Sequence, residues 1–254
     1  MSLLTANYHT HTYRCGHASG KDREYVEAAI AAGIGTLGFS DHTPMLFPSG
    51  HRSGFRVQPE MTADYFESIS RLRDEYKNEI RILIGVEAEY YPAIWEDYVR
   101  YLSDYPLDYR ILGQHFLWDE ETGGSSFKET DDPARLVSYY QNVLEGVDTG
   151  AFLYVAHPDV IHYVGPAEPY DEATLSFLTE IKKRDVPLEI NRLGLYDRRN
   201  YPNPRFWELA GEVGIKAVVG LDAHSPKVFA DEKSVAACFA IAEQNNLQVL
   251  KTLL

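Results

Sequence analysis

Histidine side chains near the start of the chain have a spacing that suits metal coordination. His9 and His11 are separated by one residue and follow a short apolar run. Side chains two residues apart on an extended chain point to the same face, so both imidazole rings can be directed at one ion. His17 comes shortly afterwards, and Asp41-His42 follows the next apolar run. This part of the chain therefore predicts a metal site.

Similar side chains recur along the chain wherever an apolar, strand-like run ends. Seven of the nine histidines occupy such positions, namely His9, His11, His17, His42, His115, His157 and His224. Glu87 and Asp222 occupy equivalent positions and supply carboxylates. Imidazole together with carboxylate suits Zn²⁺, Mn²⁺, Fe²⁺ or Co²⁺ better than Ca²⁺ or Mg²⁺. The set exceeds the needs of one tetrahedral ion, which predicts several ions with a bridging carboxylate, as in a multinuclear metal hydrolase.

Strand-like and helix-like segments alternate along the whole chain. After a first strand before His9, the strand-like runs are 36–40, 80–86, 109–112, 152–155, 187–190 and 216–220. The helix-like segments are 23–32, 63–76, 95–102, 133–147, 171–184, 204–213 and 233–244. Serial βα units form a parallel sheet with right-handed crossovers. We expect an α/β fold and a single domain over residues 1–254, because no change in composition marks a boundary.

The distribution of the candidate ligands favours a closed or nearly closed barrel over an open sheet. The candidates follow six different strands. In a (β/α) barrel the carboxyl ends of all strands converge on one face, whereas an open sheet spreads them along a line. The metal site is therefore expected at the C-terminal ends of the barrel strands.

Composition excludes some classes of partner and location. The formal net charge is −14, and no basic cluster exceeds Lys182-Lys183-Arg184. A nucleic-acid partner is therefore disfavoured. There is no apolar run of membrane-spanning length and no signal peptide. The two cysteines, Cys15 and Cys238, are far apart, which fits a reducing cytoplasm. Cys15 lies among the candidate ligands, but His17 is the better-placed ligand.

A long connection, 43–61, begins directly after His42 and contains several prolines and glycines. Loops of this length inside a compact domain are usually functional or mobile. We predict that it forms a lid over the site; the alternative is a surface loop without a role.

As a set, these motifs resemble those of the polymerase and histidinol phosphatase (PHP) superfamily, and the likeness extends from Tyr8 to His224. Within the superfamily the chain is most similar to the monofunctional histidinol-phosphatase branch. The stretches that carry this similarity are 40–44 with Phe47-Pro48, 156–159, 189–191 with Gly194-Leu195, and Tyr201-Pro202.

The resemblance implies a distorted (β/α)7 TIM-like barrel that holds three divalent ions, with one glutamate shared between two of them. The implied ligands are His9, His11, Glu87 and Asp222 for the first ion, Glu87, His115 and His157 for the second, and His17, His42 and His224 for the third. The ligand set accepts zinc, manganese and iron alike.

Some positions depart from the family pattern. Asn7 stands where many members carry Asp, which would weaken a hydrogen bond to a ligand. The sequence that ends at His115 reads Gly-Gln-His, whereas Gly-Ser-Val-His is commoner in the family. The basic residues expected to help bind phosphate after the fifth and sixth strands are altered: His162 and Tyr196 are near those places, and Arg192, Arg198 and Arg199 lie close by.

The reaction implied is hydrolysis of a phosphate monoester, L-histidinol phosphate, to L-histidinol and phosphate in histidine biosynthesis. A metal-bound hydroxide would attack phosphorus, with Glu87, Asp222 and His224 as the catalytic residues and Asp222 chiefly a ligand. Arginine binds phosphate through paired hydrogen bonds, so Arg192 and then Arg198 are the substrate-binding candidates, together with His162.

Other candidates and other functions remain open. Phe47 or Phe55 would cover the substrate's imidazole ring. Glu89 is a candidate for its amino group, with a helix-start carboxylate as the alternative. The alternative functions are a PHP-type phosphoesterase or phosphodiesterase acting on another small ester or nucleotide, and a non-catalytic metal-binding domain.

Overall fold

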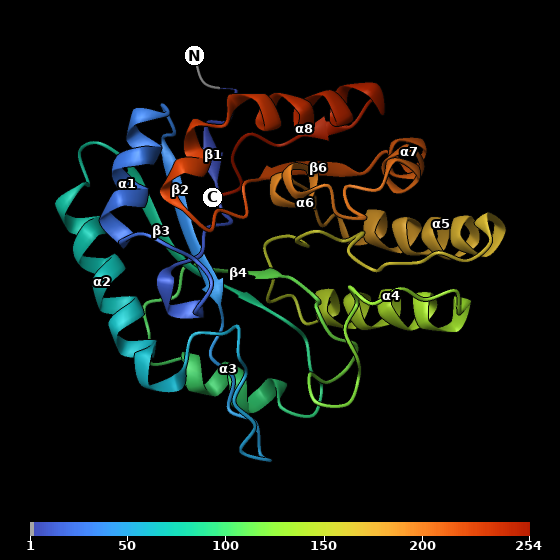
Figure 1. Ribbon diagram of the computed structural model, residues 1–254, viewed down its shortest axis with the longest axis horizontal. Helices are drawn as coiled ribbons and strands as arrows, with labels where there is room; N and C mark the ends of the chain where they lie inside the picture. Colours follow the sequence, from blue (N-terminus) through green and yellow to red (C-terminus); the bar gives the residue numbers. More distant parts are fainter. Residues whose placement is uncertain (1–2) are drawn as a thin grey trace.

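In the computed structural model, which describes residues 3–254, parallel strands follow one another around a curved sheet (Figure 1). Strands β1 (Ala6–Asn7), β2 (Thr36–His42), β3 (Arg81–Ala88) and β4 (Tyr109–Leu112) pair in this order. Strands β5 (Leu188–Asn191), β6 (Lys216–Gly220) and β7 (Gln248–Val249) form a second parallel group. Every pairing is parallel, as serial βα units require.

Single bridges join the two groups of strands into a distorted barrel. Val155 forms parallel bridges to Leu112 of β4 and to Leu188 of β5. Thr10 forms another with Ala223, just beyond β6. The expected strand over 152–155 is therefore reduced to isolated bridges. The backbone leaves the extended conformation at His157, whose φ of 29° ends the run. The short β7, at the edge of β6, was not expected.

The helices lie outside the strands, with α1 and α2 on one side and α4 and α5 packed together on the other (Figure 1). Their bounds are α1 Asp22–Ala31, α2 Thr62–Glu75, α3 Trp95–Leu102, α4 Pro133–Asp148, α5 Ala167–Arg184, α6 Arg192–Asp197, α7 Pro204–Val213 and α8 Glu232–Gln244. Only the short α6 was unexpected; the Asn191 side chain begins it by accepting the Gly194 N–H. Across residues 3–254 we find no helix of the length and apolarity that a membrane span requires.

Aromatic side chains fill the barrel below the strand ends. A buried cluster inside the barrel includes Tyr8, Tyr109 and Tyr154. The Tyr109 hydroxyl donates to the backbone oxygens of Tyr8, at 2.7 Å, and Phe39, at 3.0 Å. The barrel is thus a packed core, and its polar side chains collect at the C-terminal ends of the strands, where barrel enzymes place their sites.

Candidate metal centre

The structure brings all nine expected ligands together at the carboxyl ends of the strands. Their rings and carboxylates come from segments spread between β1 and the loop after β6. The ligands are His9 and His11 after β1, His17 after the 3-10 helix Tyr13–Cys15, His42 at the end of β2, Glu87 in β3, His115 after β4, His157 after the bridging segment, and Asp222 and His224 after β6.

Four of these residues, His9, His11, Glu87 and Asp222, form what we call the deep group. The Nε2 atoms of His9 and His11 are 3.1 Å apart. Glu87 Oε2 lies 3.5 Å from each of these nitrogens. Asp222 Oδ1 lies 3.5 Å from His9 Nε2 and 3.1 Å from His11 Nε2. All four residues are buried, so their ligand atoms converge on one point shielded from water.

The other carboxylate oxygen of Glu87 faces a second pair of rings. Glu87 Oε1 lies 2.9 Å from His157 Nε2 and 3.6 Å from His115 Nε2. Since Oε2 faces the deep group, the two oxygens of this carboxylate address two different sets of nitrogens. This is the arrangement that a bridging ligand between two ions requires.

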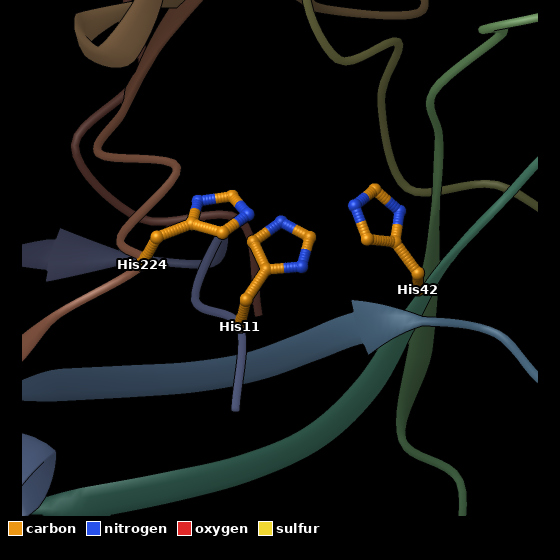
Figure 2. Close-up of side chains that lie close together, drawn as sticks. All are labelled: His11, His42 and His224. Atoms are coloured by element: carbon orange, nitrogen blue, oxygen red, sulfur yellow. The ribbon is translucent and has the colours of Figure 1, made fainter. Parts of the chain in front are cut away.

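His17, His42 and His224 form what we call the outer group. The Nε2 atoms of His17 and His224 are 2.9 Å apart. Figure 2 shows the ring of His11 beside that of His224, with His42 facing them from the end of β2. His17 is exposed and His224 is partly exposed, in contrast to the deep group.

Buried ligand atoms without hydrogen-bond partners indicate that the centre is built for a cation. Glu87 Oε2, Asp222 Oδ1 and His42 Nδ1 are all buried and form no hydrogen bond of regular geometry; their polar neighbours are other candidate ligand atoms, with His42 Nδ1 2.9 Å from Glu87 Oε2 and Asp222 Oδ1 3.1 Å from His11 Nε2. Leaving such an atom without a partner costs about 1–3 kcal/mol, and more when it is charged. Two anionic oxygens and a ring nitrogen that converge in this way fit a divalent ion.

The second ring nitrogen of the deep histidines is held by carboxylates. His9 Nδ1 lies 2.8 Å from Glu189 Oε1, and His11 Nδ1 lies 3.3 Å from Asp41 Oδ1. His115 Nδ1, in the second pair, lies 2.9 Å from a Glu89 oxygen. Carboxylates accept only, so each Nδ1 carries a hydrogen, and an Nε2 that has lost its own proton has its lone pair toward the centre.

Backbone carbonyls hold two rings of the outer group, whereas Nδ1 of the third, His42, lies 2.9 Å from Glu87 Oε2. His17 Nδ1 lies 3.1 Å from the Cys15 oxygen, and His224 Nδ1 lies 3.1 Å from the Asp222 oxygen. For these two rings the tautomer is the same, with Nε2 free to coordinate. The acceptor of His17 carries no charge, whereas His224 Nδ1 also lies 3.3 Å from Asp222 Oδ1.

Electrostatics separate the two groups further. Burial alone would lower the pKa of His9, but Glu189, Asp222 and Glu87 raise it to about 10. Burial opposes ionisation of Glu87, yet the neighbouring histidines hold the pKa of this carboxyl well below its usual value. Burial lowers the pKa of His17 and, more strongly, that of His42. Without a cation, the His9 ring thus retains its extra proton, whereas the rings of His17 and His42 are neutral.

The backbone is shaped to bring ligands inward. His157 and Asp222 have φ of 29° and 49°, a region that costs non-glycine residues about 1–3 kcal/mol. A Cβ at Gly113 would overlap the Glu87 carboxylate, and one at Gly220 would overlap Glu189. These two glycines give the carboxylates the room they occupy.

Glu189 is a functional residue to which sequence reasoning assigned no role. It is fully buried, and besides His9 it accepts the His157 N–H at 3.1 Å and the Asn191 side-chain amide at 2.9 Å. A carboxylate within an otherwise apolar strand was the available signal. Asn7 bonds the backbone and Thr10, and no ligand ring.

A cavity of about 440 Å³ opens beside the metal centre. Apart from ligands, its lining consists of Phe55, Phe116, Phe127, Leu193, Asp197, Arg199 and Tyr201. The expected substrate residues Arg192, Arg198 and His162 are not among the described residues of this lining. Arg192 is buried and paired with Asp231, Arg198 is exposed, and His162 lies nearest Glu129.

A buried arginine anchors the long connection 43–61 over the cavity. Arg56 pairs with Glu89 and with Glu120, the latter at 2.8 Å. Its neighbour Phe55 packs edge-on against His42, with ring centroids 5.1 Å apart. Phe47 contacts His51 and Tyr91 instead. Glu89 is therefore committed to Arg56 and His115, and Phe55 is the aromatic residue that this connection contributes to the cavity.

Comparison with known proteins identifies the family. A family model described as the PHP domain matches residues 7–193, so the chain belongs to the PHP domain family. It is 30% identical over 224 residues to a "Probable histidinol-phosphatase" from Deinococcus radiodurans, covering 86% of this chain and 85% of that protein. It is 26% identical to the "Histidinol-phosphatase" of Bacillus subtilis, covering 85% and 92%.

A solved structure supports the fold. The crystal structure of histidinol phosphate phosphatase from Lactococcus lactis, complexed with zinc, L-histidinol and phosphate, superposes with a TM-score of 0.75 at 21% identity. The match covers 98% of this chain and 96% of that chain. Both the expected superfamily and the expected barrel are thereby confirmed.

Proposed function

We propose that this protein is a metal-dependent histidinol-phosphatase, which hydrolyses L-histidinol phosphate to L-histidinol and phosphate. The observation that carries the proposal is the convergence of nine ligands beside a cavity of metabolite size, with the Glu87 carboxylate directed at two sets of nitrogens. The names of the relatives indicate the substrate.

The residues present fit three divalent ions, which we propose to be zinc, manganese or iron. The deep group would hold the first; Glu87, His115 and His157 the second; and the outer group the third. When bound, such ions lower the pKa of coordinated water toward ~7 and offset phosphoryl charge.

The protein's own groups then position the reactants. Glu87 would be shared by the first and second ions, and Asp222 would complete the ligands of the first. His224 directs Nε2 toward His17 at the partly exposed edge of the centre, beside the cavity where a leaving alcohol would depart. Phe55 and Phe127 line the cavity on the other side, where both lie against the His115 ring. We place this reaction in the cytoplasm, consistent with the two unpaired cysteines.

The test is phosphate release from L-histidinol phosphate by protein reconstituted with Mn²⁺ or Zn²⁺ and analysed for metal. Rapid release is expected, with loss of activity in His42→Ala. If protein shown to hold about three ions releases no phosphate, the proposal is wrong, and a panel of phosphodiesters becomes the next assay.

A further inference from the structure

The charged edge of the cavity consists of two residues that follow one another closely in the chain. Asp197 ends α6, and Arg199 comes two residues later. Among the described residues that line the cavity, Arg199 is the one lysine or arginine, and Asp197 is the one carboxylate outside the expected ligands. Any ionic recognition of substrate beyond the metal centre therefore depends on this pair.

The local fold directs both side chains to the same edge. Arg198 between them is left-handed, with φ of 56°, and the Arg199 N–H returns to the Gly194 oxygen at 2.9 Å. The Arg199 guanidinium donates to Asp197 at 2.8 Å and to the Tyr201 hydroxyl at 2.9 Å. The Asp197 and Arg199 side chains are 38% and 37% exposed, so each can exchange its partner for a ligand.

Arg199 also lies near the metal centre. It donates a hydrogen bond to the hydroxyl of Tyr201, and the ring centroid of Tyr201 is 5.8 Å from that of His157. Burial opposes the charge on Arg199, but the attraction of Tyr201, hydrogen bonds with Asp197 and Tyr201, and the attraction of Asp222 raise its pKa. Arg192 is held by Asp231 and stacks on Tyr196. Arg199 is thus the guanidinium placed to reach a phosphoryl group at the centre.

We propose that the Asp197–Arg199 pair selects phosphate monoesters of amino alcohols. Arg199 binds the phosphoryl group, and Asp197 binds the ammonium group on the carbon next to the one that carries the ester oxygen. The inference rests on the proposed phosphatase function and adds the source of its substrate preference. A partly exposed ion pair contributes little to stability, so opening it costs little. A zwitterionic substrate gives each member a new charged partner.

The same pair discriminates against esters that lack an ammonium group. When such an ester engages Arg199, the Asp197 carboxylate loses its partner and faces the phosphoryl charge. Rejection by an unpaired charge is a common source of specificity. The aromatic rings of Phe55 and Phe127 line the cavity and suit a planar substituent, but they cannot make this distinction.

The experiment compares L-histidinol phosphate with its deaminated analogue, 3-(imidazol-4-yl)propyl phosphate. Asp197→Asn should lower the ratio of the two kcat/KM values roughly 10- to 100-fold, by losing only the amine substrate. Arg199→Gln should lower kcat/KM for both esters by a similar factor. Arg205→Gln is the matched control, because Arg205 pairs with Asp171 and Glu208 away from the cavity and should change neither.

A binding measurement separates failure of this inference from failure of the proposed function. Calorimetry of L-histidinol and of 3-(imidazol-4-yl)propan-1-ol, each with inorganic phosphate and metal-loaded protein, gives the same comparison without turnover. Loss of the preference for L-histidinol in Asp197→Asn supports the inference even if the esters are not hydrolysed. An unchanged ratio in both assays, or an Arg199→Gln variant indistinguishable from Arg205→Gln, overturns it.

Discussion

The deep and outer groups use the same side-chain chemistry in opposite surroundings. In the deep group, buried histidines stand between carboxylates, and Glu189 and Asp41 hold the far nitrogens of His9 and His11. In the outer group, His17 is exposed, and backbone oxygens hold His17 and His224. A charged acceptor raises the basicity of the coordinating imidazole more than a carbonyl does.

This contrast indicates that the two groups hold their ions with different affinity. A buried, carboxylate-rich set should hold its ion tightly and permanently. The outer set is partly exposed and has no carboxylate of its own, although Glu87 lies against His42 and Asp222 against His224. It should bind more weakly and exchange, which suits the position where phosphate enters and leaves. The predictions below change one side of the contrast at a time.

The largest effect is expected from Glu87, whose carboxylate faces both the deep group and the pair formed by His115 and His157. Glu87→Gln removes the charge that faces both sets of nitrogens, so about two of three ions should be lost and kcat/KM should fall roughly 10³-fold. Metal analysis and phosphate release measure this. Glu168→Gln, exposed on α5, is the control. A variant that retains full metal content would contradict the bridging role.

Removing an outer ligand should have a smaller and more selective effect. His17→Ala is expected to lose about one ion and roughly 10² in kcat/KM, because the deep ligands are untouched. In the wild type, a chelator should remove one ion quickly and the others slowly, and the variant should lack the fast phase. Simultaneous loss of all ions from the variant would show that the two groups are not independent.

A still smaller effect on activity is expected from the acceptor behind a deep ligand. Glu189→Gln keeps the size of the side chain but removes the charge that holds His9 Nδ1. Affinity for the first ion should fall about 10- to 100-fold, while activity should return when metal is added in excess. Competition with a coloured chelator measures the affinity. Activity that excess metal does not restore would assign Glu189 a role beyond orienting His9.

The places of the candidate ligands in the fold were predictable from sequence because strand ends can be recognised as the ends of apolar runs. Parallel strands of a barrel direct these ends to one face, so His42, Glu87 and His115 had to meet. The helix-like segments between these apolar runs were likewise placed to within a few residues. The strand at 152–155 was overestimated, because its apolar side chains do not reveal that only Val155 forms bridges to the neighbouring strands.

Partners that lie far apart in sequence set the limit of prediction. Glu189 and His9 are 180 residues apart, so neither residue signals the other. Arg192 directly follows a strand, as a phosphate ligand would, but Asp231 in a later loop holds its guanidinium. Long side chains can point in many directions, and tertiary partners decide among them. For this reason the structure was needed to favour Arg199 over Arg192 and Arg198, which lie close to it in the sequence.

The smallest effect concerns protons and leaves the metal-saturated enzyme unchanged. Because the pKa of His9 is raised to about 10 without metal, this ring carries a proton at about pH 7.5, which must leave before Nε2 can coordinate. Affinity for the first ion should therefore rise with pH up to about pH 10. His17 and His42 have lowered pKa values, are neutral at about pH 7.5, and should coordinate without releasing protons. Calorimetric titration with Zn²⁺ in two buffers of different ionisation enthalpy counts the protons. Wild type and His17→Ala should release the same number of protons, although the wild type binds one more ion. Release of an additional proton by the wild type would contradict the predicted electrostatic difference between the two groups.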